Sequence, residues 1–417
     1  MPSFLGRLHT MRKSIFHAIR RYFVTRGGNI AIITALAAPA IVGFCGLGAE
    51  TGFWYFRQSD IQAAADIGAY NADMTLRDGS NKTQVVNVAT TDTGNNGWRP
   101  AQGTITVHTP PTSGPNQNAR SVEILVTENE QRFFTALFSS GTVPIKARAV
   151  ATYDVQAPAC MVGLNKTKKN TVQFWGNALA DFTSCNIVSD SSSSSAFSVG
   201  GAARVTAPCA DSYGGANIQA TLTLTSCKSI TTNAPFVADP YANVGAPTVG
   251  SSCLTPSGNE LNPGTYCGLT LQGTETLDPG VYVINGGTLK INANSLISGT
   301  GITFYLTGGA TLQINGSATL NLTAPTSGPF AGLLFYGDRT QSTAVNTING
   351  TATSNITGAV YFHSQEVDFL GNFSGSGGCT QVVADTIYYT GSATFSTNCS
   401  GTGMASIPVP TAVRLVE

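Results

Sequence analysis

The residues best suited to acid–base chemistry form one short group late in the chain. His363, Glu366 and Asp368 lie within the segment YFHSQEVDF. Paired carboxylates in a groove are what glycoside hydrolases need. Side chains alternate along a strand, so we expect Glu366 and Asp368 on one face and His363 on the other. Charged residues make up only 11% of the chain, so we predict no enzyme and no cofactor.

A second pattern would suit a divalent cation. Asp190 opens the run Asp-Ser-Ser-Ser-Ser after the apolar segment CNIVS, which fits a D-x-S-x-S metal signature. A domain built around that signature needs alternating strands and helices that bring further ligands in on separate loops. No helical periodicity follows Ser195. The sequence therefore predicts a solvated serine-rich turn without a metal.

The nine cysteines divide by position. Cys45 lies in an apolar run, and the other eight are Cys160, Cys185, Cys209, Cys227, Cys253, Cys267, Cys379 and Cys399. An even number of this kind is typical of disulfides in an oxidising compartment. We expect the sequential pairs 160–185, 209–227, 253–267 and 379–399, because chain neighbours stay close in an elongated β stack. Zinc is disfavoured, since no C-x-x-C pair occurs.

Seven asparagines lie in N-x-S/T sequons. As turn residues they would tolerate positive φ and bond to the backbone; as glycan acceptors they would mark exposed loops. The turn interpretation is preferred. The seven are Asn165, Asn315, Asn321, Asn349, Asn355, Asn372 and Asn398.

The element that must position all of these is an uncharged run of twenty residues, Ile30 to Ala49. As a helix it is just long enough to cross a bilayer. The preceding residues 1–29 form a basic arm with six Lys or Arg and no acid, so the N-terminus is expected in the cytoplasm. A single inner-membrane span with a periplasmic or extracellular remainder is the prediction. A cleaved secretory signal is the alternative, and a pilin-type leader is disfavoured because Ile33 stands where a glutamate is required.

A helix is expected to continue beyond the membrane, over residues 30–78. Glu50 marks the exit, and Trp54 belongs to an aromatic group suited to the membrane interface. Ile61, Ala65 and Ala69 then recur at helical spacing, and alanine stripes permit close helix approach. We therefore interpret these five residues as an element for contact with the membrane and with partner helices.

The run RGGNIAIITALAAPAIVGFCGLGAETGFWYFRQSDIQAAADIGAYNAD resembles the N-terminal module of TadE/TadG-like proteins of tight-adherence (Flp) pilus assembly. In that family an Arg-Gly start, an Ala/Leu/Pro membrane helix, an acid near its exit and an alanine-rich helix follow in this order. Here Glu50 takes the acid's place and IQAAADIGAYNA that of the alanine helix. Gly-Ala-Glu-Thr replaces the commoner Val-Asp-Tyr, which leaves the role of Glu50 open.

Residues 79–157 predict a small α+β domain similar to the membrane-proximal region of the same family. Strands are expected at 85–90, 104–109, 121–127 and 143–153, with a hairpin turn in TPPTSGPNQNA. The segment ENEQRFFTALFS predicts a short helix between the last two strands.

Residues 158–417 predict a disulfide-containing, right-handed parallel β-solenoid (β-helix), so the whole chain is expected to be mainly β. INGSAT at 314–319 recurs as INGTAT at 348–353 and as TGSAT at 390–394, with weaker copies FWGNA at 174–178 and SVGGAA at 198–203. TLKI at 288 and TLQI at 311 are 23 residues apart, a spacing that suits one coil of three short strands. A β-sandwich is the alternative.

The favoured function is a non-enzymatic, membrane-anchored component of pilus assembly or an envelope scaffold, with pilus-assembly or pilin subunits as partners. The alternative is an anchored adhesin whose solenoid binds a glycan or a surface, and a carbohydrate-active enzyme ranks third. Lys and Arg together equal Asp and Glu at 22 each, so no global field favours nucleic acid.

Overall fold

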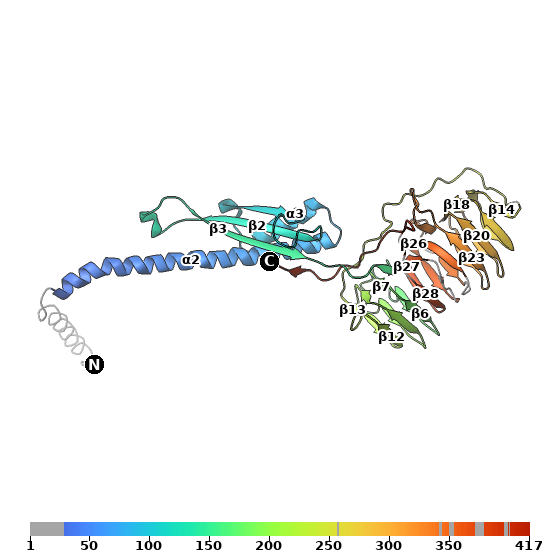
Figure 1. Cartoon of the computed structure of the whole chain (residues 1–417), viewed down its shortest axis with the longest axis horizontal. Coiled ribbons are helices and arrows are strands. Elements are labelled where there is room, and N and C mark those ends of the chain that lie inside the picture. The colour runs from blue at the N-terminus through green and yellow to red at the C-terminus, as the bar shows by residue number, and fades with distance from the viewer. Residues whose placement is uncertain are drawn as a thin grey trace, which may run out of the picture. The chain divides into compact units, whose positions relative to one another are not determined.

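A computed structural model describes residues 29–417 except 257, 342–343, 350–353, 372–378, 396–398 and 400. The described chain is mainly β, with one long apolar helix at its N-terminal side (Figure 1). It divides into two compact units. The first contains the described residues up to Asp73, then Lys82–Ala151 and Leu415–Glu417, and the second contains Met74–Asn81 and Thr152–Arg414. The main division along the chain therefore falls between residues 151 and 152.

Helix α2 (Asn29–Arg77) is continuous through Pro39 and is long and apolar enough to cross a membrane. Its first twenty residues leave large apolar side chains such as Leu36 and Phe44 exposed, which suits lipid contact. The following part of α2, up to Asp73, belongs to the first unit. The expected continuation of the apolar helix beyond Ala49 is thus confirmed in the fold.

Helix α3 (Lys82–Asn95) occupies the segment where we predicted a strand at 85–90, so that prediction was wrong. Its β-branched residues favour a strand by propensity, but Val85, Ala89 and Thr93 also repeat every four residues. That spacing places all three on one buried helical face, and a β-carbon at Gly68 of α2 would clash with Thr93. Close packing on α2 therefore outweighs local strand propensity.

The sheet of the first unit has the order β1-β2-β3-β29. Strands β1 and β2 are antiparallel, with Ile105 opposite Val126, and the expected hairpin turn connects them. The helix expected in ENEQRFFTALFS was wrong: strand β2 takes the first three residues of the segment, up to Glu130, and the only helical part is the 3-10 turn η2. The elements are η1 (Pro100–Gln102), β1 (Gly103–His108), β2 (Ser121–Glu130), η2 (Thr135–Leu137), β3 (Val143–Thr152) and β29 (Arg414–Leu415).

The second unit consists of short strands in parallel ladders. Its first group is β4 (Ala159–Gly163), β5 (Val172–Phe174), β6 (Leu179–Phe182), β7 (Asn186–Ser189), β8 (Phe197–Val199), β9 (Arg204–Ala207), β10 (Ala210–Ser212), β11 (Ala216–Ile218), β12 (Thr221–Leu224) and β13 (Thr231–Thr232). Its second group is β14 (Glu260–Leu261), β15 (Gly264–Tyr266), β16 (Leu269–Leu271), β17 (Thr274–Leu277), β18 (Gly280–Asn285), β19 (Thr288–Ile291), β20 (Leu296–Thr300), β21 (Ile302–Thr307), β22 (Thr311–Ile314), β23 (Thr319–Thr323), β24 (Leu333–Gly337), β25 (Val345–Ile348), β26 (Asn355–Phe369), β27 (Thr380–Tyr389) and β28 (Ser392–Phe395).

The sequence repeats predict the register of these ladders. TLKI and TLQI lie side by side, with Leu289 opposite Leu312, and the hydroxyls of Thr288 and Thr311 are 3.2 Å apart. Phe174 of FWGNA lies opposite Val199 of SVGGAA. Each strand from β14 to β20 pairs with the strand three positions later, which is the pattern expected from a repeat of three strands.

The stacking order does not follow the chain. Strand β27, near the C-terminal end, pairs with β4 and β5, so residues 159–232 continue the stack beyond its last strands. A long connection, residues 233–259, then carries the chain to β14 at the other end of the pairing order. Sequence similarity between repeats predicts that they stack, but it does not specify which copy is next to which.

The core of the second unit is an aromatic and aliphatic ladder. Tyr282, Phe304 and Phe335 follow one another in adjacent strands, and the Phe304 and Phe335 rings stack with centroids 5.5 Å apart. All three side chains are fully buried. The inward positions thus form a continuous apolar stack, and the alternate positions face outward.

Candidate functional site

Glu50 lies at the centre of a clasp between α2 and the loop from β2 to β3. Its carboxylate accepts hydrogen bonds from the backbone N–H groups of Phe133 (2.6 Å) and Thr135 (2.7 Å) and from the Thr135 hydroxyl (2.9 Å). Glu50 is 2% exposed. Hydrogen bonds to a carboxylate are among the strong ones in proteins, so this acid fixes the loop to the helix.

Aromatic contacts surround the clasp. The rings of Phe53 and Phe133 meet edge to face with centroids 5.8 Å apart, and the Arg132 guanidinium lies over the Trp54 ring at 5.8 Å. The Phe134 ring lies directly against Gly46, where a β-carbon would clash with it. A glycine one turn before Glu50 therefore allows the loop to approach the helix.

One turn beyond these contacts, Arg57 ties α2 to strand β2. Its guanidinium contacts Glu128 at 2.6 Å and Glu130 at 3.3 Å, and it also pairs with Asp60. Arg99 contacts the same two glutamates. Sequence analysis did not identify this cluster; its signal was the Glu-x-Glu spacing, which puts both acids on one strand face.

The stripe interpreted as a partner contact is used inside this chain. Ile61, Ala65 and Ala69 are all 0% exposed, so their apolar surfaces already pack within the first unit. They are therefore unavailable to a partner helix in this structure, which corrects that interpretation. Small side chains are needed here because the helix lies close to its own sheet and to α3.

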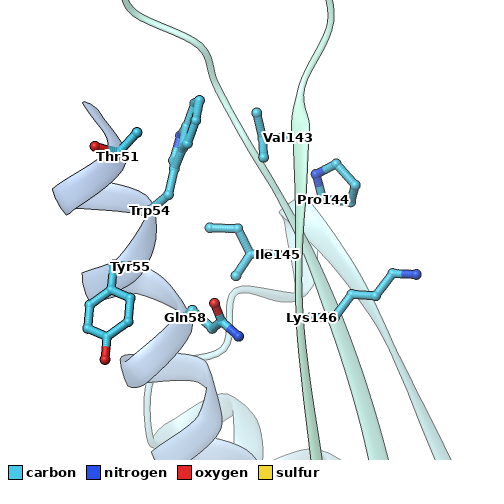
Figure 2. Close-up of a pocket in the computed structure, with 8 residues that line it drawn as sticks. All are labelled: Thr51, Trp54, Tyr55, Gln58, Val143, Pro144, Ile145 and Lys146. Carbon is cyan, nitrogen blue, oxygen red and sulfur yellow. The ribbon is translucent and has the colours of Figure 1, made fainter. Parts of the chain in front are cut away.

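A groove of about 440 Å³ lies between α2 and the N-terminal end of β3 (Figure 2). In this view Ile145 points toward the helix, whereas Lys146 points away from it. The groove is lined by Thr51, Trp54, Tyr55, Gln58, Val143, Pro144, Ile145 and Lys146.

The backbone of β3 beside this groove is partly protected. Gln62 donates to the Arg148 carbonyl at 2.7 Å and accepts from its N–H, and Val150 pairs with the C-terminal residues Val416 and Glu417. The backbone N–H and C=O groups of Arg148 and Val150 thus point away from β2. Every second residue of a strand points its backbone groups to the same side, so Pro144 is in the same position, and proline has no N–H to donate to a further strand. This arrangement disfavours the addition of a further strand.

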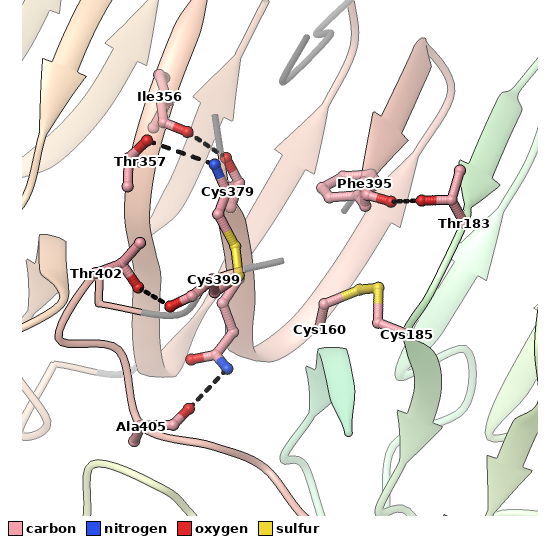
Figure 3. The surroundings of a disulfide bond; sticks show 12 residues. Cys160, Thr183, Cys185, Ile356, Thr357, Cys379, Phe395, Cys399, Thr402 and Ala405 are labelled. Carbon is pink, nitrogen blue, oxygen red and sulfur yellow. Dashed lines mark hydrogen bonds between the residues drawn. A yellow bond between two sulfur atoms is a disulfide. The ribbon is translucent and has the colours of Figure 1, made fainter. Parts of the chain in front are cut away.

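Four disulfides connect the eight cysteines of the second unit in the sequential pairs that we expected, 160–185, 209–227, 253–267 and 379–399. Cys379 directly precedes strand β27, and its N–H donates to the Thr357 hydroxyl; the Cys399 carbonyl accepts from the Thr402 hydroxyl (Figure 3). Cys45 is not disulfide-bonded. Disulfides of this number indicate an oxidising compartment.

Asp190 is buried, not part of a solvated turn, so that prediction was wrong. Its carboxylate accepts from the Val237 N–H at 2.8 Å and contacts the Lys166 ammonium at 3.2 Å. Burial raises the pKa of Asp190 to about 6, although both partners act against the shift. The hydroxyls of Ser191 and Ser192 donate to backbone carbonyls, so this run fixes a connection in place.

Glu366 and Asp368 lie together on one face, as alternation predicted. Burial and the neighbouring Glu366 charge raise the pKa of Asp368 to about 6, and Glu366 accepts a hydrogen bond from Thr386. His363 belongs to a different group, with Ser364 at 2.8 Å and Asp239 at 3.9 Å. The expectation that His363 lies on the opposite face was wrong, because the strand pairing shifts register between Phe362 and Glu366 and simple alternation does not hold across this stretch.

The group around His363 has the residue types of a catalytic triad but lacks its geometry. The Ser364 hydroxyl donates to the Arg339 carbonyl at 2.7 Å, so its proton is not directed to the imidazole. Asp239 accepts from the Tyr361 hydroxyl at 2.8 Å and pairs with Arg339. These contacts hold the 233–259 connection against the sheet, a role that sequence analysis did not identify.

The sequon asparagines occupy two kinds of position. Asn165 accepts from the N–H groups of Thr167 and Lys168 in a turn, as expected. Asn321 and Asn355 lie opposite each other in strands β23 and β26, so the turn prediction was wrong for these two. Asn315 and Asn349 follow strands, and Asn372 and Asn398 fall outside the described residues.

Comparison with protein-family models, with curated proteins and with solved structures finds no match to this chain. Among its described residues, no group of three or more His, Cys, Asp or Glu side chains is arranged to hold a metal ion.

Proposed function

We propose that this chain is a non-enzymatic, single-span component of tight-adherence pilus assembly or an envelope scaffold, acting through protein–protein packing. Its N-terminus would lie in the cytoplasm, α2 would cross the inner membrane, and both units would lie in the periplasm or outside the cell. The resemblance of residues 26–73 to TadE/TadG-like proteins supports the pilus context.

The observation that carries the proposal is the attachment of the first unit to its anchor. Helix α2 runs unbroken from the apolar segment into the sheet domain, and Glu50, Arg57 and Gln62 each bind that domain at a different level. A rigid connection of this kind transmits force and orientation from the membrane, as a scaffold requires, and a flexible linker would not.

The second unit would serve as the outer module. We infer that its parallel ladders close into a right-handed β-solenoid, in which inward aromatic and aliphatic residues stack. The supporting observations are the three-strand repeat of pairings and the positive φ of turn glycines such as Gly287 and Gly309 between strands.

One observation favours the second candidate, an adhesin. The outward positions of neighbouring strands form a continuous polar row that suits a glycan: Lys290, Gln313, Thr347, Asp368, Tyr388 and Gln173 follow one another in register. Amide, hydroxyl and carboxylate groups beside an aromatic ring can bind a polar, flat-faced ligand.

Removal of the second unit separates the two functions. Val155 and Pro410 form an isolated antiparallel bridge, so the chain enters and leaves this unit at adjacent points. Replacing residues 156–409 by a short Gly-Ser linker keeps Leu415–Glu417 available to β3. Loss of pili supports the assembly function, while intact pili with lost adhesion supports the adhesin. Turnover of a polysaccharide that Glu366→Gln abolishes would contradict both.

A further inference from the structure

Residues 133–145, which comprise the end of the loop between β2 and β3 and the first three residues of β3, are thirteen consecutive residues without a charged side chain. We call this segment the tip. Its sequence is FFTALFSSGTVPI, and Arg132 and Lys146 flank it directly. Leu137 and Phe138 are 85% and 82% exposed, and Phe133 and Phe134 are also exposed. Large apolar residues gathered at such exposure mark a contact surface.

The tip lies beside the apolar segment of α2. Phe134 contacts Gly46, which lies inside the segment Ile30–Ala49, four residues before Glu50. At a rise of 1.5 Å per residue, this contact is about 6 Å along the helix from Glu50, on the side of the membrane span. The Phe134 side chain of the tip therefore lies at the level of the apolar segment of α2.

We propose that the tip inserts into the outer leaflet of the bilayer beside α2, as a second, non-spanning membrane contact. This inference rests on the proposed function, because it requires α2 to span the membrane. The occupant of the tip's apolar surface is lipid, since that surface continues the lipid-facing surface of the span. The insertion is shallow compared with a hydrocarbon core of about 30 Å.

The charges at the base of the tip agree with this placement. Arg132 and Lys146 would lie at headgroup level, where cationic side chains remain hydrated and attract anionic lipid. Trp54 and Tyr55 line the groove at the same level, and such aromatic side chains are enriched at membrane interfaces. The Glu50 carboxylate is buried and accepts three hydrogen bonds, so it is not presented to lipid.

The backbone of the tip satisfies part of its hydrogen bonding without water. The N–H groups of Phe133 and Thr135 bond to Glu50, and those of Phe138 and Ser139 bond to the Thr135 carbonyl within the turn. Irregular backbone at membrane depth is costly unless its polar groups are paired, so these bonds lower the cost of insertion. The hydrogen bonds to Glu50 thus hold the tip on α2 and also pair two of its backbone N–H groups, which lowers the cost of placing them in lipid.

The test uses the full chain in nanodiscs with anionic lipid. Cys45→Ser removes the cysteine that is not disulfide-bonded, and Leu137→Cys then carries a spin label under non-reducing conditions. Leu137 is so exposed that the label does not disturb packing. Two matched controls carry the label at Leu36 in the span and at Thr104, an exposed position of β1. Accessibility to oxygen and to a water-soluble nickel reagent is measured at each position.

Lipid insertion predicts that the label at 137 resembles the one at 36, with high oxygen and low nickel accessibility. A label at 137 that resembles the one at 104 overturns the proposal and leaves the membrane anchor intact. Low accessibility of the label at 137 to both reagents would show that the tip is buried against protein and not in lipid, and this result would also overturn the proposal. Nickel accessibility at 36 would contradict the proposed function itself, and the tip insertion with it.

Discussion

Substitution of Glu50 tests whether one carboxylate holds the tip to the helix. In the structure the carboxylate accepts three hydrogen bonds, from the N–H groups of Phe133 and Thr135 and from the Thr135 hydroxyl, at 2.6 to 2.9 Å. Glu50→Gln keeps the size of the side chain but replaces one acceptor oxygen by an NH₂ group, which has no acceptor lone pair. Glu50→Ala removes all three bonds.

The expected effect follows from the number of bonds lost. Loss of one hydrogen bond to a charged group shifts a local opening equilibrium by about tenfold to a hundredfold. Glu50→Gln loses at least one such bond, so amide exchange at Phe133 and Thr135 should accelerate by about that factor. Glu50→Ala loses three and should accelerate exchange further, toward the rate of an unprotected loop.

The measurement is hydrogen–deuterium exchange of the peptide spanning 131–142, with the full chain in nanodiscs. Glu260→Gln, which changes an exposed glutamate elsewhere, is the matched control and should leave this peptide unchanged. Exchange within threefold of the wild type in both Glu50 variants would refute the reasoning, because the tip would then be held by its aromatic contacts alone.

Three further predictions concern the second unit. Burial raises the pKa of Asp190 to about 6, above an unfolded value of about 3.9, so its ionisation destabilises the folded state as pH rises from about 4 to 7. Asp190→Asn should remove this loss of stability. The difference in unfolding free energy between variant and wild type, measured by urea unfolding at each pH, should therefore change by about 3 kcal/mol across that range. A difference that does not depend on pH would contradict a raised pKa of Asp190. Phe335→Ala leaves a cavity in the stacked core and should lower the unfolding free energy by about 3–5 kcal/mol, with Phe335→Leu much milder. The double variant Cys379→Ser/Cys399→Ser opens a loop with a separation of 20 residues and should lower stability by about 3 kcal/mol, seen as a reduced thermal midpoint; a midpoint equal to that of the oxidised wild type would show that the bond adds nothing.

Much of the fold could be predicted from the sequence where one local pattern decides it. The helix over 30–49, long and apolar enough to cross a membrane, follows from the length of this run and its lack of charge. The register of TLKI on TLQI follows from a repeat that puts like residues side by side. Alternation along a strand placed Glu366 beside Asp368. These features depend on length, charge and periodicity, which are all visible in a short window of the chain.

The candidate site depended on contacts between distant segments. Glu50 meets Thr135 across 85 positions, and Arg57 meets Glu128 across 71, so no local pattern identified either pair. The same limit explains the errors at 85–90, where packing on Gly68 selected a helix, and at Asp190, where a connection from residue 237 buried the acid.

The sequence by itself determined that a charge-free helix precedes a disulfide-bonded array of short strands, because hydrophobic length, alternation and cysteine spacing are properties of the chain alone. Only the tertiary structure decided that residues 159–232 stack after β27 and that the alanine stripe faces its own domain. Near-identical repeats offer many pairings of similar local energy, and an apolar helical face fits any apolar surface. The choice among them depends on the total burial and hydrogen bonding of the complete fold.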